Sequence, residues 1–334
     1  MSPAMPTLLA LILAAVTGIS MAAAPQGSWV KSSYFSTFYP NGAGALDYSL
    51  YLPAGLQSDT RTSKPPLVVA LHGCKEDGEK LDEISRLHEL ADIYGFALLY
   101  PEQSVFRNSD HCWNWFLPMN QGRGLGEAEL IAGATAEIVD RYDLDAGRTY
   151  IVGFSSGGAM ANIVASCYSD LFAAAAIHSG LEFLAASTIE DTDSVLLKGG
   201  VLSPEDSAQS AYDCSGEYGH KMPTIILHGS VDVRVAPVNS DQIFKQFQIF
   251  NDLLDDGKTN ESVPHHPTHV SKEQPAGKYS YTVEDVEVDG QVLIRNITVD
   301  GMAHAWSGGA AGLPNSDPQG PDASRLIWDF ISTK

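Results

Sequence analysis

Positive charge is scarce in this chain of 334 residues. It has 20 Lys and Arg against 41 Asp and Glu, which gives a formal net charge of −21 at pH 7. Nucleic acids and anionic membrane surfaces are bound through positively charged faces, so this balance argues against both as partners. The acidic surface suits a neutral or cationic substrate, and it equally serves solubility alone. No obligate protein partner is indicated.

Charge is absent altogether from the first 24 residues, which contain no Asp, Glu, Lys or Arg. Within them, Leu8 to Val16 is a continuous apolar run, too short to span a membrane, and small residues follow it. The pattern is typical of a secretory signal peptide, although the basic residues that usually come first are missing; a retained anchor is the alternative. We expect residues 1–24 to be a signal peptide, cleaved after Ala22 or Ala23, and residues 25–334 to be secreted, either extracellular or periplasmic.

Cysteine is also sparse, and its spacing argues against a zinc site. The four cysteines are Cys74, Cys112, Cys167 and Cys214, with no Cys-x-x-Cys pair among them. In an oxidising compartment two disulfides are the default expectation, and three pairings are possible. The order along the chain favours Cys74–Cys112 and Cys167–Cys214. No metal site and no cofactor is predicted.

Internal repeats, coiled-coil patterns and low-complexity linkers are absent, so we expect a single catalytic domain over residues 25–334. Apolar or alternating runs predict strands at 48–52, 67–72, 96–100, 150–152, 173–177, 224–228 and 291–299, the last after an Asp-Gly hairpin turn. Helical patterns occur at 80–94, 127–141, 156–167, 241–254 and 323–332. The alternation predicts an α/β fold with a mostly parallel central sheet and helices on both faces.

One polar stretch, residues 255–278, does not fit this alternation. It contains three prolines and the group His265, His266 and His269. Clustered histidines are potential metal ligands. The intervening prolines and the lack of a carboxylate at helical spacing favour a solvated loop instead.

The position of the segment Gly153-Phe154-Ser155-Ser156-Gly157 makes it a candidate for a catalytic motif. A Gly-x-Ser-x-Gly match is weak by itself in a chain rich in glycine and serine, where a flexible turn is the alternative. Here it directly follows a predicted strand and precedes a predicted helix, where a nucleophile elbow lies. The glycines allow strand and helix to pass each other at a strained turn. Ser155 holds the central position and is the expected nucleophile, whereas Ser156 is expected to act through its backbone N–H.

A serine nucleophile needs a base, and the base needs a carboxylate to orient it. In a doubly wound hydrolase the order along the chain is Ser, then Asp or Glu, then His, each after a later strand. Asp232 follows the strand predicted at 224–228, and His304 follows the strand predicted at 291–299. Taken singly, a helix-capping aspartate and a surface histidine are the simpler interpretations. Their order and placement together predict a catalytic triad of Ser155, Asp232 and His304.

An apolar strand earlier in the chain ends in His72, Gly73 and Cys74. This is where the loop after the third strand donates an N–H to an oxyanion hole. We expect the N–H of Cys74, with that of Gly73 as a further candidate, to act together with the N–H of Ser156. His72 is expected to be a buried, hydrogen-bonded histidine that supports this loop together with Gly73.

Several segments in one order carry a resemblance to a known family. They are Leu71-His72-Gly73-Cys74; Pro101-Glu102-Gln103; Cys112-Trp113-Asn114-Trp115-Phe116; the serine motif with Gly157-Gly158-Ala159-Met160; Phe172-Ala173-Ala174-Ala175 with His178-Ser179-Gly180; Leu227-His228-Gly229; and His304-Ala305-Trp306-Ser307-Gly308-Gly309. Together they resemble the polyhydroxybutyrate (PHB) depolymerase family of esterases, related to feruloyl and acetylxylan esterases, from about residue 35 to the C-terminus. Because the His-Gly-Cys segment precedes the serine motif, the chain is similar to the type 1 arrangement of that family.

The resemblance implies an α/β-hydrolase fold and carries over the same three triad residues. It also implies His72 as the oxyanion histidine and a Cys74–Cys112 disulfide that braces the oxyanion loop. Phe154 and Ser156 stand where Leu and Ala are common in the family. A small residue at position 156 still serves, because only its backbone is needed.

The resemblance implies a secreted serine esterase acting on short-chain polyhydroxyalkanoates, such as poly(3-hydroxybutyrate) or its oligomers. A feruloyl or acetylxylan esterase acting on plant cell-wall esters is the alternative. A peptidase and a catalytically inactive secreted binding protein of the same fold are more remote. Polymer depolymerases of this type usually carry a linker and a polymer-binding domain after the catalytic one. Neither follows here, so we expect amorphous or soluble polyester, oligomers and small esters rather than crystalline polymer.

Aromatic residues near these motifs are candidates for substrate contact. Trp306 stands two residues after His304, and we expect its ring to pack against an apolar acyl unit, with a core position as the alternative. Trp113 and Trp115 are expected in the core. 

Overall fold

The structure is a computed structural model that describes Met1 and residues 27–37, 44–57 and 63–334. The predicted signal peptide at residues 1–24 therefore lies almost entirely outside the described residues. In the described ranges a ten-stranded sheet has the order β1-β2-β4-β3-β5-β6-β7-β10-β9-β8. Strands β4, β3, β5, β6, β7 and β10 run parallel to their neighbours in this series, and antiparallel strands flank them on both sides.

The strands of the large sheet are β1 (Ser28–Phe35), β2 (Ala45–Leu52), β3 (Leu67–Leu71), β4 (Ala97–Glu102), β5 (Thr149–Phe154), β6 (Ala174–His178), β7 (Thr224–Gly229), β8 (His269–Glu273), β9 (Tyr281–Val288) and β10 (Gln291–Val299). A short pair consists of β11 (Trp306–Ser307) and β12 (Ser316–Asp317). The helices are α1 (Gly78–Ser85), α2 (Leu87–Tyr94), α3 (Gly126–Arg141), α4 (Ser156–Cys167), α5 (Thr192–Lys198), α6 (Pro204–Ser215), α7 (Val238–Asp256) and α8 (Ala323–Ile331).

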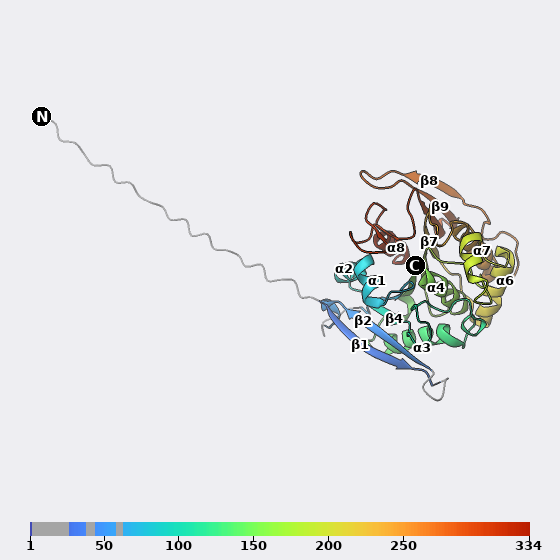
Figure 1. Ribbon diagram of the computed structural model, residues 1–334, viewed down its shortest axis with the longest axis horizontal. Coiled ribbons are helices and arrows are strands. Elements are labelled where there is room, and N and C mark those ends of the chain that lie inside the picture. The colour runs from blue at the N-terminus through green and yellow to red at the C-terminus, as the bar shows by residue number, and fades with distance from the viewer. Residues whose placement is uncertain (2–26, 38–43, 58–62) are drawn as a thin grey trace.

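Helices cover both faces of the sheet, which explains why its central strands are apolar throughout. In β3, Leu67, Val69 and Leu71 pack into the core on one face, and Val68 and Ala70 into the core on the other. This alternation follows from the two-residue period of a strand. Helices α1, α2 and α8 pack on one face, and α3, α4, α6 and α7 on the other. Figure 1 shows α1, α2 and α8 gathered to the left and α6 and α7 to the right. The predicted α/β fold is confirmed.

All seven predicted strands are present, but one predicted helix is divided. The pattern at 80–94 forms α1 and α2, which meet at Arg86 in the left-handed conformation, with φ of 56°. The buried carboxylate of Asp82 explains the break, because its Oδ1 accepts the N–H of His88 at 3.1 Å and the hydroxyl of Tyr100 at 2.7 Å. Tertiary hydrogen bonds therefore end a helix that the periodicity continues.

The stretch 255–278 is more ordered than the expected solvated loop. Its last part contains β8, which lies at the edge of the sheet and begins at His269. Its first part is held by the carboxylate of Asp252, which accepts the N–H of Val263 at 3.1 Å and lies 2.9 Å from Nε2 of His265. Apart from the end of α7 and β8, the stretch is a loop as expected, and one buried acid on α7 holds its first part.

Disulfides join Cys74 to Cys112 and Cys167 to Cys214, the pairing that the chain order favours. The first links the loop after β3 to the loop after β4, and the second ties the end of α4 to α6. Among the described residues, no helix is long and apolar enough to cross a membrane.

Candidate active site

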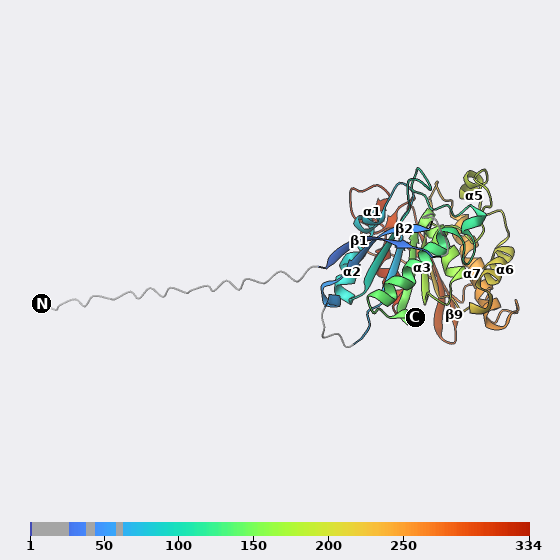
Figure 2. The ribbon, with the colours of Figure 1, turned by 90° about the horizontal axis from the view of Figure 1, so that it is seen from below.

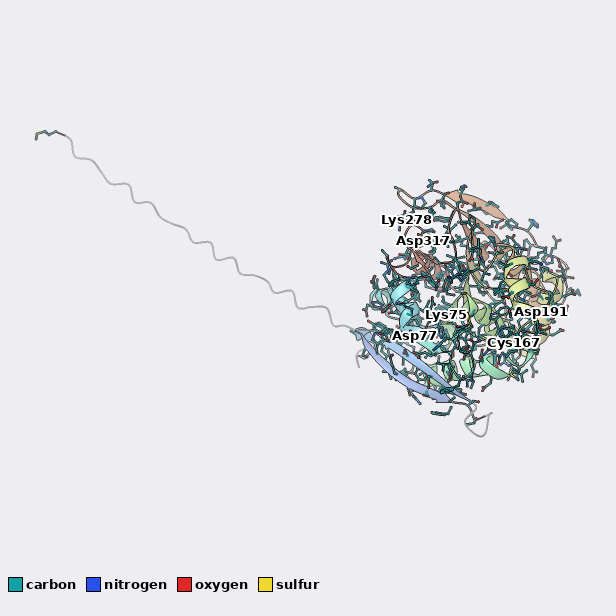
Figure 3. All side chains as sticks on the ribbon, viewed as in Figure 1. Lys75, Asp77, Cys167, Asp191, Lys278 and Asp317 are labelled. Carbon is teal, nitrogen blue, oxygen red and sulfur yellow. A yellow bond between two sulfur atoms is a disulfide. The ribbon has the colours of Figure 1, made fainter. Side chains whose placement is uncertain are left out.

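A cavity of about 500 Å³ opens at the carboxyl edge of the parallel strands. Its lining comes from the loops that follow β3, β4, β5, β6, β7 and β10. Figure 2 shows α5, which supplies part of this lining, at the upper rim of the molecule. In Figure 3, Lys75 and Asp77 mark the loop after β3 near the middle of the view, and Asp191 marks the start of α5 to their right. Ligands of open α/β sheets bind at this edge, because several loops converge there.

Ser155 stands at a strained turn between β5 and α4. Its φ of 58° and ψ of −121° are rare for a residue with a side chain. A Cβ at Gly153 would lie 2.1 Å from the carbonyl oxygen of Gly157, and one at Gly157 would lie 2.2 Å from that of Leu71. Both positions therefore require glycine, as the interpretation of this segment as a nucleophile elbow expects.

The structure brings the three expected triad side chains into one line. The hydroxyl of Ser155 lies 2.9 Å from Nε2 of His304, and Nδ1 of His304 lies 2.6 Å from Oδ2 of Asp232. The other carboxylate oxygen of Asp232 accepts the backbone N–H groups of Arg234 and Val235, each at 2.9 Å. In this arrangement Nδ1 of His304 donates to the carboxylate and Nε2 is free to take the serine proton.

The surroundings of Asp232 keep it ionised. Burial alone would raise its pKa, because the charged form loses hydration. The hydrogen bond and charge of His304 and the N–H of Val235 outweigh this effect, so the pKa of Asp232 lies below its ordinary value. A carboxylate that stays charged can orient the imidazole and stabilise an imidazolium.

In the loop after β3, Cys74 lies between two residues whose N–H groups are hydrogen-bonded. The N–H of Gly73 donates to Oε2 of Glu76 at 3.0 Å, and that of Lys75 to the carbonyl of Asp110 at 2.7 Å. Gly73 is therefore not the further oxyanion donor, because its N–H is already used; it supports the loop. Cys74 stands between these two anchored positions and lines the cavity. Ser156 also lines it and is the first residue of α4, where N–H groups have no partner inside the helix.

His72 lies behind this loop and is completely buried. Its Nε2 accepts the N–H of Gln103 at 3.1 Å, so the ring proton is on Nδ1, which donates to the carbonyl of Gly73 at 2.8 Å. Burial lowers the pKa of His72 to about 4, so the ring is neutral at pH 7. The side chain spans two loops, as expected for a supporting residue.

Trp306 does not reach the cavity. Its side chain is 1% exposed, its Nε1 donates to Oγ of Ser324 at 3.1 Å, and its ring stacks on His178 with centroids 5.0 Å apart. The expected substrate contact is therefore wrong, because neither face of the ring is open to a ligand. Trp113 and Trp115 are both core residues, as expected, and Trp115 and Phe116 also contribute to the cavity wall.

Sequence reasoning missed two other parts of this cavity. One is the wall made by the segment after β6, with Ile189, Thr192 and Leu196 among its lining residues. The other is the pair of Arg234 and Asn315, which come from loops far apart in the sequence. The Cys74–Cys112 disulfide could have indicated that the residues after Cys112 lie near the oxyanion loop. No motif in the sequence marks the segment after β6 or the pair of Arg234 and Asn315.

The sheet topology and the cavity at the ends of its parallel strands define the class of fold. The chain has an α/β-hydrolase fold. It belongs to the family described as "Esterase PHB depolymerase", whose sequence profile matches residues 46–263.

The relatives that the chain resembles in sequence are named for different substrates. The chain is 30% identical over 264 residues to poly(3-hydroxyalkanoate) depolymerase C of Paucimonas lemoignei. The aligned region covers 78% of this chain and 58% of that protein. It thus spans less than two thirds of that relative. It is 29% identical over 248 residues to feruloyl esterase B of Neurospora crassa, covering 72% of this chain and 79% of that protein.

A solved structure supports the fold. The acetyl xylan esterase from Aspergillus awamori superposes with a TM-score of 0.68 over 92% of this chain and 100% of that chain, at 22% identity. At this level of identity the likeness shows the fold, and function depends on the residues of the site.

Proposed function

We propose that the chain is a serine esterase whose nucleophile is Ser155. The observation that carries the proposal is the hydrogen-bonded line from Ser155 through His304 to Asp232 in the wall of the cavity. A serine hydroxyl at neutral pH is a poor nucleophile unless such a base removes its proton. The strained turn at Ser155 supports the same role, because strain of this kind is concentrated at functional sites.

The reaction follows from the geometry. His304 takes the proton of Ser155 as the hydroxyl oxygen attacks the ester carbonyl, and Asp232 stabilises the imidazolium. The N–H groups of Cys74 and Ser156 face the oxyanion of the tetrahedral intermediate. His304 then protonates the leaving alcohol, and water hydrolyses the acyl-enzyme by the same steps in reverse.

For the substrate we favour short-chain polyhydroxyalkanoates such as poly(3-hydroxybutyrate), or their oligomers. Membership of the family and the similarity to the depolymerase of Paucimonas lemoignei support this choice. The cavity has apolar side chains, including Trp115, Phe116 and Leu196, which suit a small acyl unit with methyl groups. Feruloyl or acetylxylan ester hydrolysis is the second candidate, favoured by the similarity to the feruloyl esterase of Neurospora crassa.

Export from the cytoplasm belongs to the same proposal. Two disulfides are typical of proteins that fold in an oxidising compartment. With the uncharged apolar N-terminus, they support an extracellular or periplasmic location for this esterase.

Two measurements test the proposal. A fluorophosphonate probe should label the wild-type chain and fail to label Ser155→Ala, whereas Ser210→Ala, at a serine on α6 away from the cavity, should be labelled normally. Labelling of Ser155→Ala at the wild-type rate would contradict the assignment. Turnover of a 3-hydroxybutyrate trimer should exceed that of methyl ferulate, and the reverse order would favour the second candidate.

A further inference from the structure

Arg234 lies in the wall of the cavity, two residues after Asp232. Its backbone N–H donates to the Asp232 carboxylate at 2.9 Å, so the loop that orients the triad also fixes this residue. Its side chain extends to Asn315, where Nη1 donates to Oδ1 at 3.2 Å. The carbonyl of Asn315 accepts the N–H of Trp306, two residues after His304, at 2.7 Å. The guanidinium therefore belongs to the side of the cavity that carries His304.

No carboxylate pairs with Arg234 in the part of the chain that the structure describes. Five other arginines there do have such partners: Arg123 with Asp170, Arg141 with Glu137, Arg148 with Asp145, Arg295 with Asp285 and Arg325 with Asp329. Arg86 and Arg107 donate to backbone carbonyls outside the cavity. Asn315 is a neutral acceptor and uses one of the five N–H groups of the guanidinium. In a chain with 41 acidic and 20 basic residues, an unneutralised cation in the catalytic cavity is available to an anion from outside.

The Arg234 side chain is held by a short relay of hydrogen bonds. Nδ2 of Asn315 donates to Oε1 of Glu76 at 2.8 Å, and Oε2 of Glu76 accepts the N–H of Gly73 at 3.0 Å. Glu76 is buried, and Asn315 has a φ of 55°. The relay connects the cation to the oxyanion loop, so both face the same substrate from positions that are set before it binds.

We propose that Arg234 binds a carboxylate of the substrate on the leaving-alcohol side of the scissile ester. This inference rests on the proposed function and narrows its substrate to the free-acid end of a hydroxyacyl oligomer. The acid-terminal unit of such an oligomer has the ester oxygen at one end and a free carboxylate a few bonds away. Acetyl and feruloyl esters of plant polysaccharides release neutral sugar alcohols, which offer a guanidinium no such partner.

The reaction itself is unchanged by this contact. The acyl carbon bonds to Oγ of Ser155, its bond to the terminal hydroxyacid unit breaks, and His304 transfers the serine proton to the oxygen that leaves. Water then releases the acyl group, so one water is consumed for each ester cleaved. Arg234 neither gives nor takes a proton. It holds the departing unit through charge-assisted hydrogen bonds and thereby determines specificity.

Two carboxylates elsewhere in the cavity wall limit where a substrate anion can lie. Asp110, after β4, stands 3.9 Å from Nζ of Lys75, and Asp193 lies in the first turn of α5. Both repel a carboxylate placed near them. The side occupied by Arg234 and Asn315 is thus the favourable place for an anion.

The experiment compares two trimers of 3-hydroxybutyrate, one with its free terminal carboxylate and one capped as a primary amide. Wild type should have the higher kcat/KM on the free acid. Arg234→Gln should lose about tenfold or more on the free acid and little on the amide, because a hydrogen bond between charged groups is removed only in the first case. Arg234→Lys should keep part of the preference. Lys198→Gln is the matched control, since it makes the same charge change on an exposed residue of α5 and should leave the ratio unchanged.

The outcomes separate this inference from the proposed function. If wild type cleaves both trimers equally well, or if Arg234→Gln loses the same factor on both, Arg234 does not read the carboxylate and the proposed esterase activity stands. The inference is also overturned if Lys198→Gln lowers the ratio as much as Arg234→Gln, because the effect is then one of general charge. If wild type cleaves neither trimer but hydrolyses methyl ferulate, the proposed substrate fails as well.

Discussion

Two walls of the cavity differ in how their polar groups are paired. In the catalytic wall, formed by the loops after β3, β7 and β10, most polar groups are hydrogen-bonded. In the α5 wall, formed by the segment 181–201, a buried acid has no hydrogen-bond partner among the described residues. Asp232 accepts hydrogen bonds at both oxygens, and His72 uses both ring nitrogens. Nδ1 of His228 is an exception on this side. Across the cavity, both carboxylate oxygens of Glu182 are buried and have no hydrogen-bond partner among the described residues.

Apolar side chains are exposed on both walls. Around α5, Ile189 is 61% exposed, Leu197 56% and Val201 55%. On the catalytic wall, Val231 is 52% exposed and Val233 79%, so the two walls differ in their hydrogen bonding and not in exposed apolar side chains. We infer that one wall is built for fixed geometry, which the chemistry requires, and the other for contact with substrates of varying shape.

The largest effect is expected on the catalytic wall. Asp232→Asn should lower kcat by about 10⁴-fold, because a neutral amide neither selects the required tautomer of His304 nor stabilises its charged form. Steady-state kinetics on a soluble ester measure this loss. Asp300→Asn makes the same change at an exposed, ion-paired aspartate just after β10 and should keep kcat within about twofold. A loss below about tenfold in Asp232→Asn would show that the wall is less constrained than its hydrogen bonds indicate.

An intermediate effect is expected beneath the α5 wall. Burial raises the pKa of Glu182 to about 8, with a smaller contribution from the charge of Glu205. Since the ordinary pKa is 4.5, the stability due to the protonated form is fully present below about pH 4.5 and is lost as the pH rises through 8. Glu182→Gln removes this loss. At pH 8–9 its free energy of unfolding should exceed that of wild type by about 1–3 kcal/mol, and it should unfold at a higher temperature.

Thermal unfolding at pH 5 and pH 9 measures the difference. The advantage of Glu182→Gln should be largest at pH 9 and small at pH 5. Glu217→Gln, at an exposed position in the turn after α6, should follow the wild-type profile at both values. The same advantage at both pH values would mean that Glu182 is not protonated in the folded chain.

The smallest effect is expected at the rim of the α5 wall. Ile189→Ser should raise KM by about two- to fivefold with little change in kcat, because it removes apolar contact area without touching the reacting groups. Leu197→Ser replaces an equally exposed residue of α5 that does not line the cavity, and its KM should equal that of wild type. A fall in kcat in Ile189→Ser would indicate that this wall also positions the scissile ester.

Much of the fold could be predicted because burial leaves a local mark. A strand covered on both faces is apolar throughout, as in Leu67–Leu71, and the central parallel strands of this sheet show the pattern. The same strands led to the proposed triad, since Ser155, Asp232 and His304 each stand shortly after a strand end. The two glycines beside Ser155 are required by backbone contacts that a sequence motif already encodes.

Other features depend on residues that the sequence does not relate. The break between α1 and α2 is decided by Asp82, whose hydrogen bonds to His88 and Tyr100 outweigh continuous helical periodicity. Trp306 follows His304 closely, yet its ring lies in the core, where it donates to Ser324 and stacks on His178. Proximity along the chain does not fix the direction of a side chain.

By itself the sequence determined the strands of the central parallel sheet, the turn at Ser155 and the placement of Ser155, Asp232 and His304 after strand ends, because each rests on local pattern and on the rule that loops after parallel strands meet at one edge. Only the tertiary structure decided what surrounds them. The relay from Arg234 through Asn315 and Glu76 to Gly73 joins three loops that are distant in the sequence, and it exists because the sheet brings their ends within hydrogen-bonding distance.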